Sequence, residues 1–150
     1  MISKHISLKE ATKSNTAQRL GIENFPNNDT LIQMQALAEN IFEPLRKHVG
    51  GPIYITSFYR SPELNKAIGG SSKSQHCLGQ AIDVDDVLGR ATNKEMFEYI
   101  KDNLDFDQLI WEFGDDNNPN WVHVSYNAAG NRGNILQAVK EDGRTIYKKM

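Results

Sequence analysis

The sequence predicts an α+β fold in which N-terminal helices pack on a mainly antiparallel sheet. Two observations carry this prediction. Apolar residues recur at helical spacing in the first third of the chain, and short segments of alternating polarity cluster in the second half. The 150 residues suffice for one hydrophobic core, so we expect one domain over residues 1–150.

The helices are expected mainly before residue 50. Ser7 caps a short first helix, and a second short helix is expected over residues 17–20. The longest helix opens at Asp29 or Thr30 and carries apolar residues three and four positions apart. Pro44 lies inside this pattern, and because proline lacks the backbone N–H it should kink or restart the helix.

The strands are expected where apolar and polar residues alternate. These segments are residues 53–58, 81–85, 108–113, 121–126, 135–139 and 145–148. The last two flank Asp142 and Gly143, a pair that favours a tight hairpin turn. Further helices are expected after the capping residues Ser61 and Thr92.

Composition excludes several classes of protein. The net charge of −2 provides no general positive field for a polyanion, so we expect no nucleic-acid partner. Cys77 is the only cysteine, which excludes an internal disulfide framework and a cysteine-based zinc site. The first nine residues do not resemble a signal peptide and no segment is apolar enough to span a bilayer. We therefore expect a monomer made in the cytoplasm and not inserted in a membrane.

Two histidines and one aspartate stand out as possible metal ligands. His76 precedes a turn at Gly79, and Asp83 follows on a strand of otherwise apolar alternation. His123 lies in the middle of another strand. A buried carboxylate needs a partner, which can be a metal ion or a cation such as Arg60. Spacing alone leaves open a zinc site, a hydrogen-bonded core histidine and a surface loop histidine.

Three stretches, in this order, carry a family resemblance. They are Thr56-Ser-Phe-Tyr-Arg-Ser-Pro-Glu-Leu-Asn65, Ser74-x-His-x-x-Gly-x-Ala-x-Asp83 and Trp121-Val-His-Val-Ser-Tyr126. Together they resemble the zinc D-Ala-D-Ala carboxypeptidase family, which includes phage L-Ala-D-Glu endolysins and shares its fold with the hedgehog signalling domain. The resemblance covers roughly residues 53–126 and implies this hedgehog-like peptidase fold.

The resemblance implies that His76, Asp83 and His123 are zinc ligands. It also implies that Arg60 contacts the substrate carboxylate or the developing oxyanion, a role that suits a planar guanidinium with a permanent charge. The structural alternative for Arg60 is a surface ion pair with a nearby acidic side chain, Glu63 or Asp85.

The catalytic base is where this sequence departs from the family. Several members carry an acidic residue three positions before the last histidine, but here that position is Asn120, which cannot accept the proton of water. Glu112 is the nearest substitute, and apolar neighbours would raise its pKa toward a useful range. The alternative for Glu112 is a strand-end surface residue. Ser74, Gln75, Tyr59 and Trp121 are expected to shape the cleft.

The resemblance implies zinc-assisted amide hydrolysis in peptidoglycan stem peptides. Carboxypeptidase action at D-Ala-D-Ala and endopeptidase action at L-Ala-D-Glu both fit, as does a phage-type lysis enzyme that reaches the cell wall after release. The main alternative is a non-catalytic zinc-containing domain that binds wall peptides or a protein partner. Two further hypotheses are a hydrolase that uses the Cys77 thiol as nucleophile and a phage structural protein without a metal.

Overall fold

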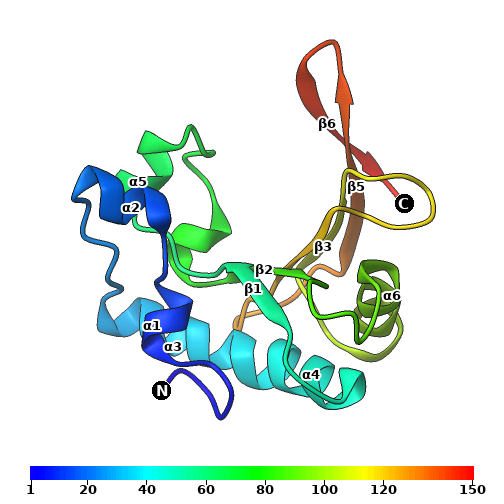
Figure 1. Ribbon diagram of the computed structural model, residues 1–150, viewed down its shortest axis with the longest axis horizontal. Helices are drawn as coiled ribbons and strands as arrows, with labels where there is room; N and C mark the ends of the chain where they lie inside the picture. Colours follow the sequence, from blue (N-terminus) through cyan, green and yellow to red (C-terminus); the bar gives the residue numbers. More distant parts are fainter.

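The computed structural model describes residues 1–150, and its centre is one six-stranded sheet (Figure 1). The strands are β1 (Tyr54–Ser57), β2 (Ala81–Asp85), β3 (Gln108–Glu112), β4 (Trp121–Ser125), β5 (Asn134–Glu141) and β6 (Arg144–Lys149). Their order in the sheet is β1-β2-β4-β3-β5-β6. Neighbours are antiparallel except β3 and β5, which run parallel. The predicted α+β class with a mainly antiparallel sheet is confirmed.

The helices precede the sheet or connect its strands. They are α1 (Leu8–Ala11), α2 (Asn15–Leu20), α3 (Asn28–Leu37), the π-helical segment η1 (Ala38–Phe42), α4 (Glu43–Val49), α5 (Pro62–Ala67), the 3₁₀ segment η2 (Gln75–Leu78) and α6 (Asn93–Asn103). None of them has both the length and the apolar character needed to cross a bilayer.

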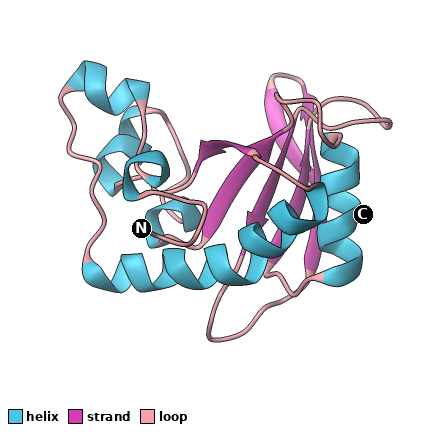
Figure 2. Cartoon of the chain, turned by 60° about the horizontal axis from the view of Figure 1, so that its bottom comes forward, coloured by secondary structure: helices cyan, strands magenta, loops and turns pink.

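The long helix runs continuously through α3, η1 and α4 (Figures 1 and 2). It opens at Asn28, slightly earlier than expected, because the Asn27 side chain accepts the backbone N–H of Thr30 at 2.8 Å. Pro44 lies in the first turn of α4, directly after the π-helical segment. The wider π turn accommodates the ring and the missing N–H of proline, so the chain restarts as an α-helix instead of ending.

The two faces of the sheet have different roles. One face packs on α3, α4 and α6 and forms the hydrophobic core with them (Figure 2). Its strand residues are Ile82, Val84, Leu109, Trp111, Val122 and Val124. Because side chains alternate along a strand, the residues between these positions point to the other face. That other face carries Asp83, Glu112 and His123, and the helices leave it accessible.

The C-terminal hairpin extends the sheet beyond the helical layer (Figure 1). Its turn consists of Asp142 and Gly143, with φ angles of 51° and 77°. Two positive φ angles are typical of the turn whose twist matches an antiparallel pair. The predicted hairpin is present, and both of its strands are longer than the alternation indicated.

Candidate metal centre

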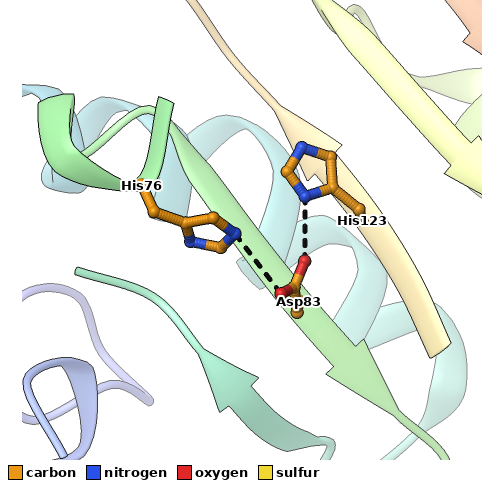
Figure 3. Close-up of side chains that lie close together, drawn as sticks. All are labelled: His76, Asp83 and His123. Atoms are coloured by element: carbon orange, nitrogen blue, oxygen red, sulfur yellow. Dashed lines mark hydrogen bonds and ion pairs between the residues drawn. The ribbon is translucent and has the colours of Figure 1, made fainter. Parts of the chain in front are cut away.

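His76, Asp83 and His123 are brought together by the adjacent elements η2 and β2 and by β4, which comes much later in the sequence (Figure 3). Asp83 on β2 and His123 on β4 are direct partners in the antiparallel register, so their side chains share one face. His76 comes from η2, the short 3₁₀ segment that leads into β2. Gly79 ends that segment with a φ of 71°, a left-handed conformation that reverses the chain toward Asp83.

The three side chains meet through one carboxylate (Figure 3). Asp83 Oδ1 lies 2.9 Å from His123 Nδ1, and Asp83 Oδ2 lies 3.3 Å from His76 Nε2. One potential ligand atom from each residue lies within 4.8 Å of the other two. His76 is buried, and the side chains of Asp83 and His123 are each only 13% exposed. The group is therefore compact and largely shielded from water.

The hydrogen bond of His76 Nδ1 determines which ring nitrogen faces Asp83 and whether that nitrogen carries a hydrogen. His76 Nδ1 donates to the carbonyl oxygen of Phe58 at 2.8 Å, since a carbonyl can only accept. A neutral ring then presents the lone pair of Nε2 to the carboxylate. A ring lone pair and a carboxylate face each other favourably only with a proton or a metal cation between them. Backbone hydrogen bonding of the outer nitrogen is also how metal-ligating histidines are usually oriented.

Electrostatics favours an ionised Asp83. Burial alone would raise the pKa of this carboxyl, but the charges and hydrogen bonds of His76 and His123 act more strongly and hold the pKa well below its usual range. Arg60, the alternative partner, forms no ion pair with Asp83. Two imidazoles and one carboxylate are a donor set that zinc accepts, and three protein ligands leave a position for water, as in catalytic zinc sites.

Glu112 lies on the same face, close to this group. It is 7% exposed, and burial raises the pKa of its carboxyl to about 7, with His123 opposing the rise and Asp83 adding to it. Glu112 therefore sits in the cleft and not on the surface. Asn120, at the position where the family usually has an acid, is exposed and donates its backbone N–H to the Glu112 carbonyl.

A cleft of about 710 Å³ opens over these residues. Among the residues expected to shape it, Arg60, Ser74, Gln75 and Trp121 line it. Tyr59 does not, because it is 7% exposed and packs in the hydrophobic core. The pairing of β1 with β2 is irregular between Ile55 and Ser57, so the alternation of the strand could not tell which way Tyr59 points.

Arg60 is positioned without an acidic partner. Its Nη1 donates to Asn65 Oδ1 at 2.9 Å, and the Asn65 amide donates to the Ser71 carbonyl at 2.7 Å. The expected alternative, an ion pair with Glu63 or Asp85, is absent. The guanidinium thus lines the cleft with its charge uncompensated by a carboxylate.

Cys77 does not have the properties of a nucleophile. Burial raises the pKa of its thiol, although Arg60 acts in the opposite direction, and a reactive cysteine needs a lowered pKa. The Cys77 side chain also does not line the cleft that contains His76 and His123.

Asp107 organises the region behind the cleft, and no sequence pattern predicted this role. Asp107 is 3% exposed and accepts hydrogen bonds from the backbone and guanidinium of Arg132 and from the amide of Gln75. These bonds connect the start of β3 with η2 and with the loop before β5. An aspartate directly before a strand has no distinctive local pattern, so only the tertiary structure reveals its role.

Two imidazoles and a carboxylate that open onto a cleft suit a metal ion that activates water for hydrolysis. Residues 4–125 match the sequence model of the family described as Peptidase M15, and the chain belongs to that family. It is a zinc-dependent metallopeptidase, so the predicted enzyme class and cofactor are confirmed. A comparison with curated proteins found no match.

Proposed function

We propose that the enzyme hydrolyses an amide bond in peptidoglycan stem peptides, and that His76, Asp83 and His123 hold its zinc ion. The observation that carries the ligand assignment is the orientation of His76, whose Nδ1 is bonded to the Phe58 carbonyl while Nε2 faces Asp83. The substrate assignment is supported by the family resemblance of residues 53–126 and by the Peptidase M15 match. The same resemblance supports action at the cell wall in phage-type lysis.

Glu112 is proposed as the general base and acid. When bound, zinc supplies Lewis-acid activation of water and of the scissile carbonyl. The Glu112 carboxylate takes the proton of the attacking water and returns it to the nitrogen of the leaving amine. A pKa raised to about 7 by burial suits both steps, because the group can accept and release a proton near neutral pH.

Arg60 is proposed to recognise the leaving side of the substrate. In both D-Ala-D-Ala and L-Ala-D-Glu, the residue that provides the leaving amine carries a free α-carboxylate. A guanidinium binds such a carboxylate through two parallel hydrogen bonds. Asn65 accepts a hydrogen bond from Arg60 Nη1 only, which leaves the other N–H donors of the guanidinium available to substrate.

Digestion of purified peptidoglycan tests this function. The wild-type protein should release peptide products that disappear with a chelator and return with zinc. Product masses distinguish loss of a terminal alanine from release of stem peptides. Glu112→Gln is the matched variant and should keep zinc but lose activity by roughly 10²- to 10⁴-fold. No release by zinc-loaded wild-type protein would contradict the substrate assignment, and near-normal activity of Glu112→Gln would contradict the assigned base.

A further inference from the structure

The C-terminal hairpin forms a wall of the cleft that the family match does not include. The match ends at residue 125, whereas β5 and β6 begin at Asn134 and Arg144. Four hairpin residues line the same cleft as the metal centre, namely Leu136, Lys140, Thr145 and Tyr147. In Figure 1 the hairpin rises as one arm, and the segment around α5 rises as the opposite arm. The hairpin is therefore in a position to contact bound substrate.

The register of the sheet aligns Tyr147 with Glu112. Glu112 on β3 pairs with Ala138 on β5, and Ala138 pairs with Tyr147 on β6. Paired residues share a face, so these three side chains form one row across the sheet. Ala138 is fully buried and small, which lets the tyrosine ring approach Glu112. Burial, and then the charges of Glu112 and Asp83, raise the pKa of Tyr147, so its hydroxyl remains a hydrogen-bond donor.

Lys140 supplies an unpaired positive charge next to this row. Its ammonium forms no ion pair and lies 5.8 Å from the centre of the Phe113 ring. Phe113 adopts a φ of 58°, a conformation that is costly for a bulky residue and often marks a functional site. Phe113 also packs against Trp121, with ring centres 5.5 Å apart. The lysine thus stands beside an aromatic surface at the edge of the cleft.

The strand order places cations on both sides of the metal centre. Arg60 follows β1 at one edge of the sheet, Asp83 and His123 lie on β2 and β4, and Lys140 lies on β5 beyond β3. A peptide that crosses the strands would therefore meet Arg60 on one side of the scissile bond and the hairpin on the other. When the scissile bond is D-Ala-D-Ala, the acyl side of the stem peptide contains D-Glu with a free α-carboxylate. One carboxylate then lies on each side of the bond, which matches two separated cations and favours the carboxypeptidase reaction.

We propose that Lys140 and Tyr147 form a second carboxylate-binding subsite, which holds the part of the stem peptide on the opposite side of the scissile bond from Arg60. The ammonium pairs with the carboxylate, and the tyrosine hydroxyl donates a hydrogen bond to it. This inference rests on the proposed function, because the stem peptide is its ligand. It adds that substrate selection depends on a hairpin outside the family match.

Calorimetric binding of stem peptides to the zinc-loaded Glu112→Gln protein tests the subsite, because binding can be read without turnover. The probes are stem peptides purified from peptidoglycan, as free acids and with their carboxylates converted to amides. Lys140→Met in this background should weaken binding of the free acid about tenfold and leave the amide unaffected. Tyr147→Phe should also weaken binding of the free acid, but by less than Lys140→Met, because it removes one hydrogen bond and no charge. Lys148→Met is the matched control, since Lys148 lies on the same hairpin, pairs with Glu141 and points to the other face.

The outcomes separate the two proposals. Equal binding of the free acid by the Lys140→Met and parent proteins would overturn the subsite while leaving the proposed function intact. An equal loss with the amide, or with Lys148→Met, would also overturn it, because the effect would then not come from a carboxylate at Lys140. If the zinc-loaded parent protein binds no stem peptide in either form, the subsite and the proposed substrate fail together.

Discussion

The side chain of His76 is oriented before any ligand binds. Its Nδ1–H is bonded to the Phe58 carbonyl, so the remaining nitrogen faces Asp83. The sequence motif indicated which three residues to consider, because two histidines and an aspartate occur at the spacing of a known family. It could not indicate the Phe58 contact, since a backbone carbonyl is available at every position and only the fold selects one.

The burial of another single side chain, Glu112, predicts that the stability of the metal-free protein depends on pH. Its folded pKa of about 7 lies above the ordinary value of 4.5, so stability is fully present below about 4.5 and is lost as pH rises through 7. Glu112→Gln removes the charge that causes this loss. The variant should be more stable than wild type at pH 8, by on the order of 2 kcal/mol, and equally stable near pH 4.

Denaturant unfolding in the presence of a chelator measures this difference. The same stability difference at both pH values would mean that the carboxylate of Glu112 is not buried in the way described. Tyr147→Phe serves as a control for general effects of changing a side chain on this face, because the tyrosine hydroxyl stays neutral over this pH range.

Among the elements, β2 has the bounds that its alternation predicted, whereas the hairpin strands extend further than expected. The difference is physical: β2 is central and buried on its core face, so polarity marks its ends clearly. Neither face of the hairpin strands is fully buried, their outer ends are exposed, and polar residues continue them without a boundary. The π-helical segment before Pro44 was also not predictable in detail, because one wider turn leaves no periodic pattern in the sequence.

The turn that delivers His76 gives a second prediction, at Gly79. A Cβ atom there would lie 2.7 Å from Met34 Cγ and 2.7 Å from the Thr30 backbone oxygen. Gly79→Ala should therefore lower the free energy of unfolding by roughly 2 kcal/mol or more, and should weaken zinc binding by displacing His76.

Gly21→Ala is the matched control, because Gly21 has a similar φ of 67° but nothing within 4 Å of its Cβ position. It should cost only about 1 kcal/mol in thermal or denaturant unfolding and leave zinc affinity unchanged. Equal effects of the two variants on stability and zinc affinity would show that the contact with α3 does not position the turn.

The connection made by Asp107 gives a third prediction. The hydrogen bonds of Arg132 outweigh burial and lower the pKa of Asp107 to about 2, with Gln75 adding to the effect. A lowered folded pKa means that this stability is present above the ordinary value of 3.8 and is lost as pH falls through about 2. Asp107→Asn should destabilise the protein by roughly 2 kcal/mol at pH 7.

Unfolding at pH 7 and pH 3 tests this, and the difference between variant and wild type should shrink at the lower pH. Glu141→Gln removes an exposed ion pair with Lys148 and should change stability by less than about 1 kcal/mol at either pH. A large, pH-independent loss for Asp107→Asn would indicate a packing defect instead of a lost charge.

In the whole molecule, one face of the sheet forms the core and the other face forms the site. The helices cover the apolar face and supply the core, which leaves the other face for the metal centre and its cleft. Alternation within β2 and β4 predicted this division for Asp83 and His123. The arrangement of the arms around the cleft was not predictable, because it depends on the parallel pairing of β3 with β5, which brings the C-terminal hairpin beside Glu112.

Zinc affinity shows directly whether His76, Asp83 and His123 hold the metal. Competition with a chelating dye should show that His76→Ala weakens zinc binding by on the order of 100-fold or more. His48→Ala is the control, because His48 stacks on Tyr99 with ring centres 4.0 Å apart, outside the cleft. It should bind zinc as wild type does. Unchanged zinc affinity of His76→Ala would contradict the assigned metal centre.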